Sequence, residues 1–308
     1  MKTVLVTGSA GLLGSAVVRA YEKENIKVIK HTRKDCNLLS KEETKSYISL
    51  MRDNGVDTVI HCAADVGGVL KNTLYTQYMF SNNLLINNNI IDACHLSSIP
   101  NFVNILSTCI FPQEATYPLT VDQIREGLPH PSTLGYSLAK RIGMLTVQSY
   151  KRVFNRNWIN IVPTNIYGIN DNFNLENSHV IPALINKANA ISKSNEDFVI
   201  WGDGTSLRQF IFSDDLAQLI KWAESNWHED EPFMAVNPEE YTITELSFMI
   251  AKKFNIPENR IKYDFAKPGG IPRMTASTNA FWYHFTPLER GLDQTINWYK
   301  NNYQNIRK

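Results

Sequence analysis

Short apolar runs alternate with longer amphipathic stretches along the first half of the chain. The apolar runs lie at 2–7, 26–30, 57–61, 101–106 and 158–163. Runs of this length, bounded by polar residues and turns, are typical of strands buried on both faces, and the stretches between them have the spacing of amphipathic helices. The alternation therefore predicts an α/β fold built on a doubly wound parallel sheet.

The chain becomes less regular after about residue 170. Glycines and prolines divide it into shorter elements, at Gly202, Gly204, Pro232, Pro238, Pro257, Pro268, Pro272 and Pro287. We therefore expect a large first domain at 1–170 and a smaller α/β domain at 171–308.

The composition is typical of a globular protein, and its charge limits the classes of partner that we expect. The 308 residues are 43% hydrophobic, which is sufficient for one large or two modest domains. The net charge is +1 and the basic residues are dispersed, so we expect neither nucleic acid nor a membrane surface as a partner. No apolar stretch reaches the 18 or so residues of a membrane span, and the N-terminus enters a strand. These features predict a soluble, cytoplasmic protein.

The four cysteines, Cys36, Cys62, Cys94 and Cys109, show no Cys-x-x-Cys spacing and no clustering with histidine. Neither a metal site nor a disulfide framework is favoured. We expect reduced thiols.

A glycine-rich turn follows the first predicted strand. The turn comprises Gly8, Ser9, Ala10, Gly11, Leu12, Leu13 and Gly14, and a helical pattern runs from Ser15 to Glu24. Glycines allow the backbone to approach a pyrophosphate, which the helix N-terminus stabilises. A purely structural turn is the alternative, but the order strand, glycine turn, helix at the start of the chain predicts a Rossmann-type dinucleotide site.

The residues after the second predicted strand indicate which dinucleotide binds. Enzymes that use NAD place an acidic residue near this point to bind the ribose hydroxyls. Here Arg33 and Lys34 follow the strand, and a guanidinium can bind a ribose 2′-phosphate through two parallel hydrogen bonds. We therefore predict NADP (NADPH), with Asp35 leaving NAD as the alternative. The small residues Ala63 and Ala64 after the third strand would let the backbone pass against the cofactor, or simply fill the core.

Tyr136 and Lys140 are spaced four residues apart in a predicted helix, so their side chains point the same way. A phenol beside an ammonium group suggests a proton donor whose pKa is lowered by the neighbouring cation. A surface tyrosine beside a solvated lysine is the alternative for this pair alone. Ser107, at the end of the fourth predicted strand, adds a hydroxyl.

In the order glycine turn, Ser107, Tyr136, Lys140, these residues resemble the extended short-chain dehydrogenase/reductase family from end to end. The resemblance implies that the second domain binds the substrate and that the segment near 205–215, with Phe210 to Phe212, returns to the large domain. It also implies a homodimer formed by the helices around Asn83 to Ser97 and Tyr136 to Phe154. Their apolar residues include Leu85, Ile86, Ile90, Ile91, Leu145 and Val147.

Thr108 and Cys109 follow Ser107 at the position where sugar-nucleotide dehydratases of this fold carry an Asp-Glu pair. Without that acid and base, water elimination has no obvious catalyst. If the segment is extended, Ser107 and Cys109 face the same side and the thiol can act as a base near a ketone. A small buried hydrophobic residue is the alternative for a free cysteine.

Several longer motifs narrow the resemblance to one branch of the family. They are Val66 to Gly68, Ser107 to Pro112, Pro163 to Gly168, Asp171 to Phe173, Asn177 to Pro182, Val199 to Gly204 and Arg208 to Phe210. They resemble the enzymes that convert GDP-4-keto-6-deoxymannose to GDP-L-fucose with NADPH. The resemblance implies that Ser107, Tyr136 and Lys140 serve reduction and that Cys109 and His179 serve epimerisation. It further implies cofactor contacts from Pro163, Asn165, Ile166, His179 and Lys140, and GDP-sugar contacts from Val66, Ser107, Lys187, Trp201 and Arg208.

The two chemistries are compatible in one site. A ketone at C4 acidifies the hydrogens on C3 and C5, and Ser107 and Tyr136 can hydrogen-bond the enolate oxygen. Inversion needs a base on one face of the ring and an acid on the other, which Cys109 and His179 offer.

Two residues depart from the branch. Ala10 replaces an arginine of some relatives in the glycine turn, and Gly269 replaces a usual aspartate. The second departure leaves open, as the alternative, a related 4-keto-sugar nucleotide reductase or epimerase that acts on another sugar or base. A third hypothesis is a non-catalytic NADP-sensing module. This hypothesis predicts the loss of Tyr136 or Lys140, and both residues are present.

Overall fold

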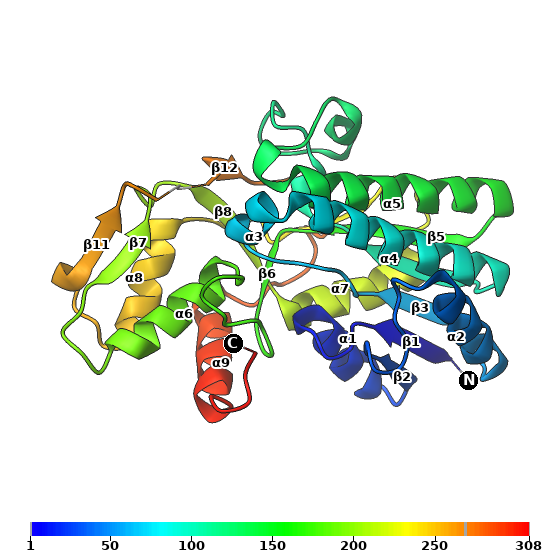
Figure 1. Ribbon diagram of the computed structural model, residues 1–308, viewed down its shortest axis with the longest axis horizontal. Helices are drawn as coiled ribbons and strands as arrows, with labels where there is room; N and C mark the ends of the chain where they lie inside the picture. Colours follow the sequence, from blue (N-terminus) through cyan, green and yellow to red (C-terminus); the bar gives the residue numbers. More distant parts are fainter. Residues whose placement is uncertain (1, 268–269, 308) are drawn as a thin grey trace.

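The computed structural model describes residues 2–267 and 270–307, and its largest sheet is parallel throughout (Figure 1). The strand order is β2 (Lys27–His31), β1 (Thr3–Thr7), β3 (Thr58–His61), β4 (Asn101–Ile105), β5 (Asn157–Pro163) and β9 (Phe233–Ala235). The five predicted strands are confirmed to within one residue. The short β9 was not predicted, although it lies in the apolar run Phe233 to Val236 that follows Pro232.

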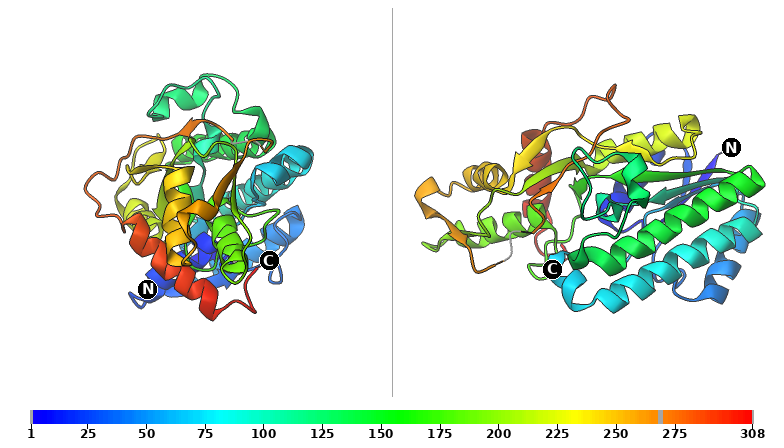
Figure 2. Two further views of the ribbon diagram at one scale, coloured as in Figure 1. Left: turned by 90° about the vertical axis from the view of Figure 1, so that its left-hand side faces the viewer. Right: turned by 90° about the horizontal axis from the view of Figure 1, so that it is seen from above.

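Helices cover both faces of this sheet, which confirms the doubly wound α/β class. On one face α1 (Leu12–Glu22) and α7 (Ser213–Asn226) share a core with β1, β4 and β5. On the other face lie α2 (Lys41–Asp53), α4 (Thr76–Leu96) and α5 (Leu134–Phe154). Figure 2 shows α4 and α5 running side by side along that face.

The strand order reverses direction at β1, because β2 lies on one side of it and β3 on the other. The carboxyl ends of β1 and β3 are therefore a topological switch point, where open α/β sheets bind their ligands. The glycine turn follows β1 and Ala63 follows β3, so both are placed at this crevice.

A smaller part of the chain forms the other end of the molecule (Figure 1). Its central strand β8 (Leu207–Phe212) pairs with β6 (Asn165–Tyr167), β10 (Glu240–Thr242) and β12 (Arg273–Met274), and β7 (Phe198–Trp201) pairs with β11 (Ile261–Asp264). The helices here are α6 (Val180–Ile191), α8 (Ile243–Lys253) and α9 (Leu288–Asn301), and a second core lies among them. The short α3 (Val69–Leu74) precedes α4.

The segment near 205–215 contacts both parts. Phe210 and Phe212 of β8 belong to the second core, whereas Ile211 between them belongs to the core of the large sheet. After Ser213 the chain enters α7 and then β9, which complete the large sheet. The domain boundary near residue 170 stays a prediction.

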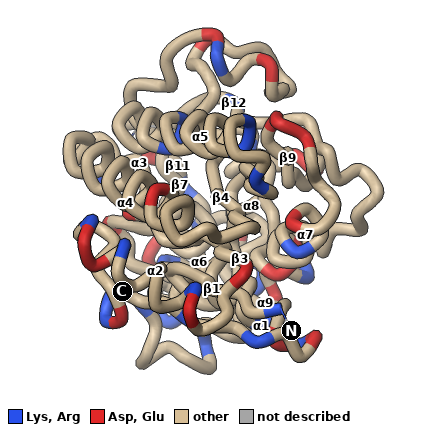
Figure 3. The backbone as a smooth tube through the Cα atoms, turned by 90° about the vertical axis from the view of Figure 1, so that its right-hand side faces the viewer, with Lys and Arg blue, Asp and Glu red and all other residues tan. Residues whose placement is uncertain are grey.

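Charged residues of both signs are interspersed along the elements seen in Figure 3. Among residues 2–267 and 270–307, no helix combines the length and apolar character needed to cross a bilayer.

The apolar residues predicted for a dimer surface divide into two groups. Ile86, Ile90, Ile91 and Val147 are buried inside the monomer, so their assignment to an exposed face is wrong. They point toward the sheet and α2, and apolar spacing alone does not say which neighbour a helix face covers. Leu85 and Leu145 are 45% and 43% exposed.

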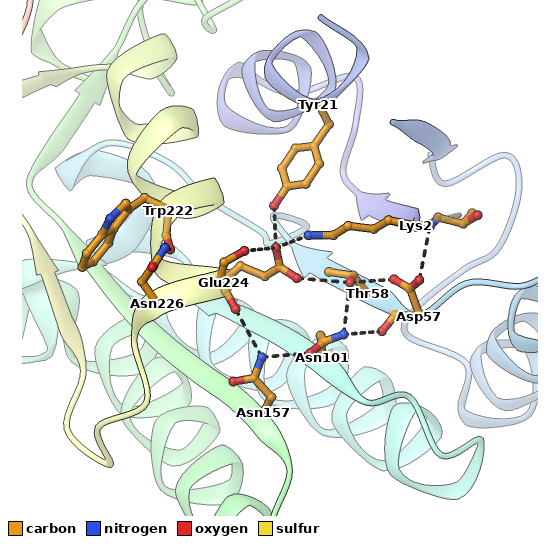
Figure 4. Close-up of polar contacts among 11 residues, drawn as sticks. Lys2, Tyr21, Asp57, Thr58, Asn101, Asn157, Trp222, Glu224 and Asn226 are labelled. Carbon is orange, nitrogen blue, oxygen red and sulfur yellow. Dashed lines mark hydrogen bonds and ion pairs between the residues drawn. The ribbon is translucent and has the colours of Figure 1, made fainter. Parts of the chain in front are cut away.

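A buried carboxylate joins the amino ends of the large sheet to α7 (Figure 4). Glu224 is 5% exposed and accepts hydrogen bonds from Lys2, from Thr58 Oγ1 at 3.3 Å and from Tyr21 at 3.5 Å. Its main-chain carbonyl accepts from Asn157 Nδ2 at 3.2 Å. These bonds satisfy a charge that would otherwise be costly to bury.

We expect Glu224→Gln to lower the free energy of unfolding by about 1–3 kcal/mol, because the amide leaves the Lys2 ammonium without its carboxylate. The matched control is Glu229→Gln, an exposed glutamate just after α7, which should change stability by less than about 0.5 kcal/mol. Urea denaturation of the three proteins measures both. Equal midpoints for Glu224→Gln and the wild type would contradict the prediction.

Candidate functional site

The glycine turn is folded as a close-fitting cradle. Gly8 has a φ of +64°, and a Cβ added there would lie 2.9 Å from the Ala63 Cα. The Gly11 N–H donates to the Gly8 carbonyl at 2.9 Å, and Gly14 packs against that same carbonyl too closely for a side chain. Side chains are thus excluded where β1 leads into α1, which fits a dinucleotide whose pyrophosphate lies at the helix N-terminus.

The end of β2 is fastened to this turn. The backbone N–H and the Oγ of Ser9 both donate to the His31 carbonyl, at 3.1 and 2.9 Å. Arg33 follows in an exposed turn. Asp35 accepts from the backbone and hydroxyl of Thr32, both at 2.7 Å, and these bonds lower its pKa. The Asp35 carboxylate therefore stabilises the turn by bonding Thr32. Arg33 is exposed in the same turn, a position compatible with binding a 2′-phosphate.

The remaining predicted cofactor residues lie near the carboxyl ends of the strands. Ala63 and Ala64 are half-buried after β3, Pro163 ends β5, and Ile166 packs against the core of the large sheet. Asn165 donates to the Gln209 carbonyl at 2.9 Å. Sequence reasoning missed Asn170, whose Nδ2 donates to the Ala10 carbonyl at 2.8 Å and so joins this loop to the glycine turn.

Tyr136 and Lys140 lie one turn apart in α5, as predicted. Lys140 is 2% exposed, its Nζ donates to the Ile105 carbonyl at 2.8 Å, and burial lowers its pKa to about 8. The prediction that Lys140 lowers the pKa of Tyr136 is wrong. Burial raises that pKa well above its usual value, Cys109 raises it further, and the lysine is bonded to a carbonyl instead of the phenol. Tyr136 is consequently protonated at neutral pH.

Ser107 and Cys109 lie together, but not for the predicted reason. The segment is a 3₁₀ turn at Thr108–Ile110, not an extended strand, and the Cys109 N–H donates to the Ser107 Oγ at 3.3 Å. Burial raises the pKa of the Cys109 thiol, whereas hydrogen bonding to Ser107 and the charge of Arg208 oppose this. The thiol thus lies beside a hydroxyl and within electrostatic reach of a guanidinium.

Sequence reasoning missed several neighbours of Cys109. Thr133 hydrogen-bonds the thiol, and Tyr117 and His130 line a small pocket beside it. Thr133 precedes Tyr136 by three residues, a spacing that could have indicated it. Tyr117 and His130 lie in loops whose folding only the tertiary structure decides.

His179 is the residue before α6, and its side chain is exposed. Partial desolvation of its ring lowers its pKa and so favours the neutral form. The preceding residues contact the glycine pair after β3. The Gly68 N–H donates to the Asn177 carbonyl at 3.1 Å, and a Cβ on Gly68 would lie 2.6 Å from the Ser178 carbonyl oxygen. Two distant motifs therefore meet here, with Val66 51% exposed beside them.

The predicted substrate contacts occupy two places. Arg208 lies within electrostatic reach of Cys109 and Tyr117, and burial lowers its pKa. Lys187 lies 4.9 Å from the ring centroid of Trp201, and Lys267 lies 5.7 Å from it. Trp201 is 44% exposed, so part of its ring is accessible to solvent beside these two cations. Gly269 lies outside the described residues.

Asp171 is a buried carboxyl beside the loop that contacts the glycine turn. It is 4% exposed; its Oδ1 accepts from the Asn172 N–H at 2.7 Å, and within the described chain its Oδ2 has no hydrogen-bond donor. Burial raises its pKa to about 7, although the charge of Arg307 opposes the shift. Arg307 donates to the Asn170 carbonyl at 2.6 Å.

Comparisons with known proteins agree with this geometry. Residues 4–237 match the NAD dependent epimerase/dehydratase family. The chain is 36% identical to a GDP-L-fucose synthase of Dictyostelium discoideum, over 100% of this chain and 98% of that protein. It is likewise 36% identical to a probable GDP-L-fucose synthase of Drosophila melanogaster, over the whole of both chains. A crystal structure of a GDP-L-fucose synthetase from Naegleria fowleri bound to NADP superposes with a TM-score of 0.90, at 32% identity and covering 100% of this chain and 95% of that one.

The raised pKa of Asp171 predicts a pH-dependent stability. The pKa of Asp171 is about 7 in the folded protein and near 4 in the unfolded chain. Below about pH 4 the carboxyl is protonated in both states and does not affect stability. Between about pH 4 and pH 7 it is ionised only in the unfolded chain, so the free energy of unfolding falls as the pH rises through this range. We expect Asp171→Asn to remove this loss, which amounts to at most about 4 kcal/mol.

The measurement is urea denaturation at pH 5 and pH 8. The difference in free energy of unfolding between the two pH values should shrink in Asp171→Asn and stay as in the wild type in Asp197→Asn, an exposed control. An unchanged difference in Asp171→Asn would show that this carboxyl does not titrate between those values.

Proposed function

This chain belongs to the NAD dependent epimerase/dehydratase family, and we propose that within it the protein is an NADP-dependent GDP-L-fucose synthase that converts GDP-4-keto-6-deoxymannose to GDP-L-fucose. Full-length similarity to GDP-L-fucose synthases of several organisms supports the proposal. One enzyme would then carry out both the 3,5-epimerisation and the 4-reduction.

The observation that carries the proposal is the grouping of Cys109 with Ser107, Tyr136 and Arg208. The Ser107 hydroxyl accepts a hydrogen bond from the Cys109 backbone N–H. Cys109 raises the pKa of the Tyr136 phenol, and the Arg208 guanidinium lowers the pKa of the Cys109 thiol. A simple ketone reductase needs the hydroxyl, phenol and lysine. The added thiol and cation are what a second, proton-transferring reaction requires.

The cofactor is NADP. The glycine turn would hold the pyrophosphate, and Arg33 would hold the 2′-phosphate, while Ala63 and Ala64 leave room for the backbone to approach. When bound, NADPH supplies the hydride for reduction at C4.

Reduction needs a proton at the C4 oxygen, and Tyr136 is suited to give it. Its raised pKa keeps the phenol protonated at neutral pH, so it enters the reaction as an acid. Ser107 offers a second hydrogen bond to the same oxygen. Lys140 is held by the Ile105 carbonyl one helical turn from Tyr136, where it would contact the bound cofactor.

Epimerisation needs a base and an acid on opposite faces of the sugar ring. Cys109 and His179 take these roles in the proposal. Cys109 is the base in this proposal, because the charge of Arg208 offsets part of the rise in the thiol pKa that burial causes. His179 is the acid: its neutral ring is exposed, takes up a proton from solvent and delivers it to the opposite face of the sugar. Bound diphosphate would also lie near Arg208, whose planar guanidinium suits two-pronged recognition.

The direct test is incubation with NADPH and GDP-4-keto-6-deoxymannose, followed by NMR identification of the product sugar. GDP-L-fucose is the expected product. A product reduced at C4 without inversion at C3 and C5 would reduce the proposal to a 4-reductase, and no NADPH oxidation would overturn it.

Arg33→Ala should raise the KM for NADPH about ten- to a hundredfold and leave the KM for NADH nearly unchanged. A charge-assisted two-pronged contact is worth roughly 1.5–3 kcal/mol and is made only to the 2′-phosphate. Lys30→Ala is the control, because Lys30 lies three residues away and pairs with Glu22 at 2.9 Å. Equal changes for both cofactors would exclude Arg33 from phosphate binding.

Exchange in deuterated water separates epimerisation from reduction. Cys109→Ser should slow deuterium uptake at C3 and C5, because a hydroxyl is far harder to deprotonate than a thiol, and His179→Gln should impair completion of inversion. Tyr136→Phe should suppress NADPH oxidation but leave exchange measurable. Each loss should be about 10²- to 10⁴-fold.

Cys36→Ser serves as the control for the thiol, since Cys36 lies in the core under α2. Exchange at the wild-type rate in both Cys109→Ser and His179→Gln would show that these two residues are structural.

We also propose a homodimer through α4 and α5. Leu85, Ile142 and Leu145 are at least 40% exposed on these adjacent helices. Light scattering should then give about twice the 35.1 kDa mass of the chain, and Leu145→Lys should shift it toward the monomer. The control Leu50→Lys, at a 55% exposed leucine of α2, should not. A wild-type particle of 35.1 kDa at micromolar concentration would disprove the dimer.

A further inference from the structure

A chain of buried hydrogen bonds runs behind the proposed site, from the glycine turn to the catalytic helix. The Ala63 N–H bonds Thr7 Oγ1 at 3.2 Å, and Thr7 Oγ1 lies 2.9 Å from His61 Nδ1. His61 Nε2 lies 3.3 Å from Asn87 Oδ1, and Asn87 Nδ2 donates to the Ala139 carbonyl at 3.3 Å. Thr7, His61 and Asn87 are all at most 1% exposed.

With a neutral His61 ring, only one arrangement of protons satisfies every link. A carbonyl can only accept, so the Asn87 amide donates to Ala139 and turns its oxygen to His61. The His61 Nε2 then carries the proton, its Nδ1 accepts from the Thr7 hydroxyl, and the Thr7 oxygen accepts from Ala63. The ring must be neutral for this, and burial together with the charge of Lys140 lowers the pKa of His61 to about 3.

The two ends of the chain lie at the two parts of the site that must be aligned. Ala63 contacts the glycine turn, where a Cβ on Gly8 would lie 2.9 Å from the Ala63 Cα. Ala139 directly precedes Lys140 in α5. Gly143, one turn later, has no side chain, and a Cβ there would lie 3.1 Å from Asn87 Nδ2. The helix can therefore approach Asn87 closely.

We propose that His61 and Asn87 are positioning residues, which hold the turn of α5 that bears Tyr136 and Lys140 in register with the cofactor-binding ends of β1 and β3. This rests on the proposed function, because it assigns the alignment of hydride and proton delivery to these two residues. A displacement of this turn by about 1 Å can slow a reaction about a hundredfold while the ligands still bind.

The test compares Asn87→Leu with Asn89→Leu. Both asparagines are buried in α4, but Asn89 donates to the Leu38 carbonyl at 2.9 Å, away from α5. The single-turnover rate of NADPH oxidation should fall about ten- to a hundredfold in Asn87→Leu and stay near the wild-type rate in Asn89→Leu. The Kd for NADPH, measured by its fluorescence, should change by less than about threefold in both, as expected of an alignment defect.

A second pair distinguishes hydrogen bonding from packing and does not depend on the folding of Asn87→Leu. Thr7→Val keeps the shape of the side chain and loses the hydroxyl, so the rate should fall. Thr7→Ser loses a methyl group and keeps the hydroxyl, so the rate should recover. If packing alone matters, the order of these two variants reverses and the proposal is wrong.

The double variant Thr7→Val/Asn87→Leu completes the test. Because both changes break the same chain, the double variant should lose less activity than the product of the two single losses. Independent losses, or equal rates for Asn87→Leu and Asn89→Leu in an active wild-type background, would overturn the proposal. An inactive wild type would instead overturn the proposed function.

Discussion

The close approach of two backbone segments governs the rest of this structure. The glycine turn after β1 passes so near the backbone of Ala63 at the end of β3 that Gly8 could not carry a side chain. This contact lies at the switch point of the parallel sheet, where α1 begins and a dinucleotide fits. Ser9 fastens the turn to the end of β2, and Asn170 fastens it to the loop that leads into α6.

Desolvation is the common cause of the proton chemistry at the site. It raises the pKa values of Tyr136 and Cys109 and lowers those of Lys140 and His179, so each group is displaced toward its neutral form. A neutral phenol is a proton donor and a neutral imidazole is a proton acceptor. The exception is the Cys109 thiol, because burial raises its pKa and a base must be deprotonated. The charge of Arg208 opposes this rise in pKa.

The second part of the chain contributes to the site through single segments. Arg208 comes from β8, and His179 comes from the start of α6, where Gly68 bonds the preceding backbone. The 3₁₀ turns at Thr108–Ile110 and Pro131–Thr133 bring Cys109 and Thr133 together. A proposed reaction on two ring carbons and one ketone thus draws on loops from both ends of the molecule, as expected when a scaffold positions loops for function.

The sequence alone determined what short-range patterns encode. Continuous apolar runs predicted the first five strands, the order of strand, glycines and helix predicted the cofactor turn, and a four-residue spacing placed Tyr136 beside Lys140 on one helix. Other properties depended on which segments meet. The burial that raises the pKa of Tyr136, the turn that joins Cys109 to Ser107, the core position of Ile90 and the link from His61 to Ala139 all arise between residues distant in the chain. Local periodicity fixes the direction of a side chain within its own element, but its solvation and partners are set by the elements packed against it, and only the tertiary structure decides those.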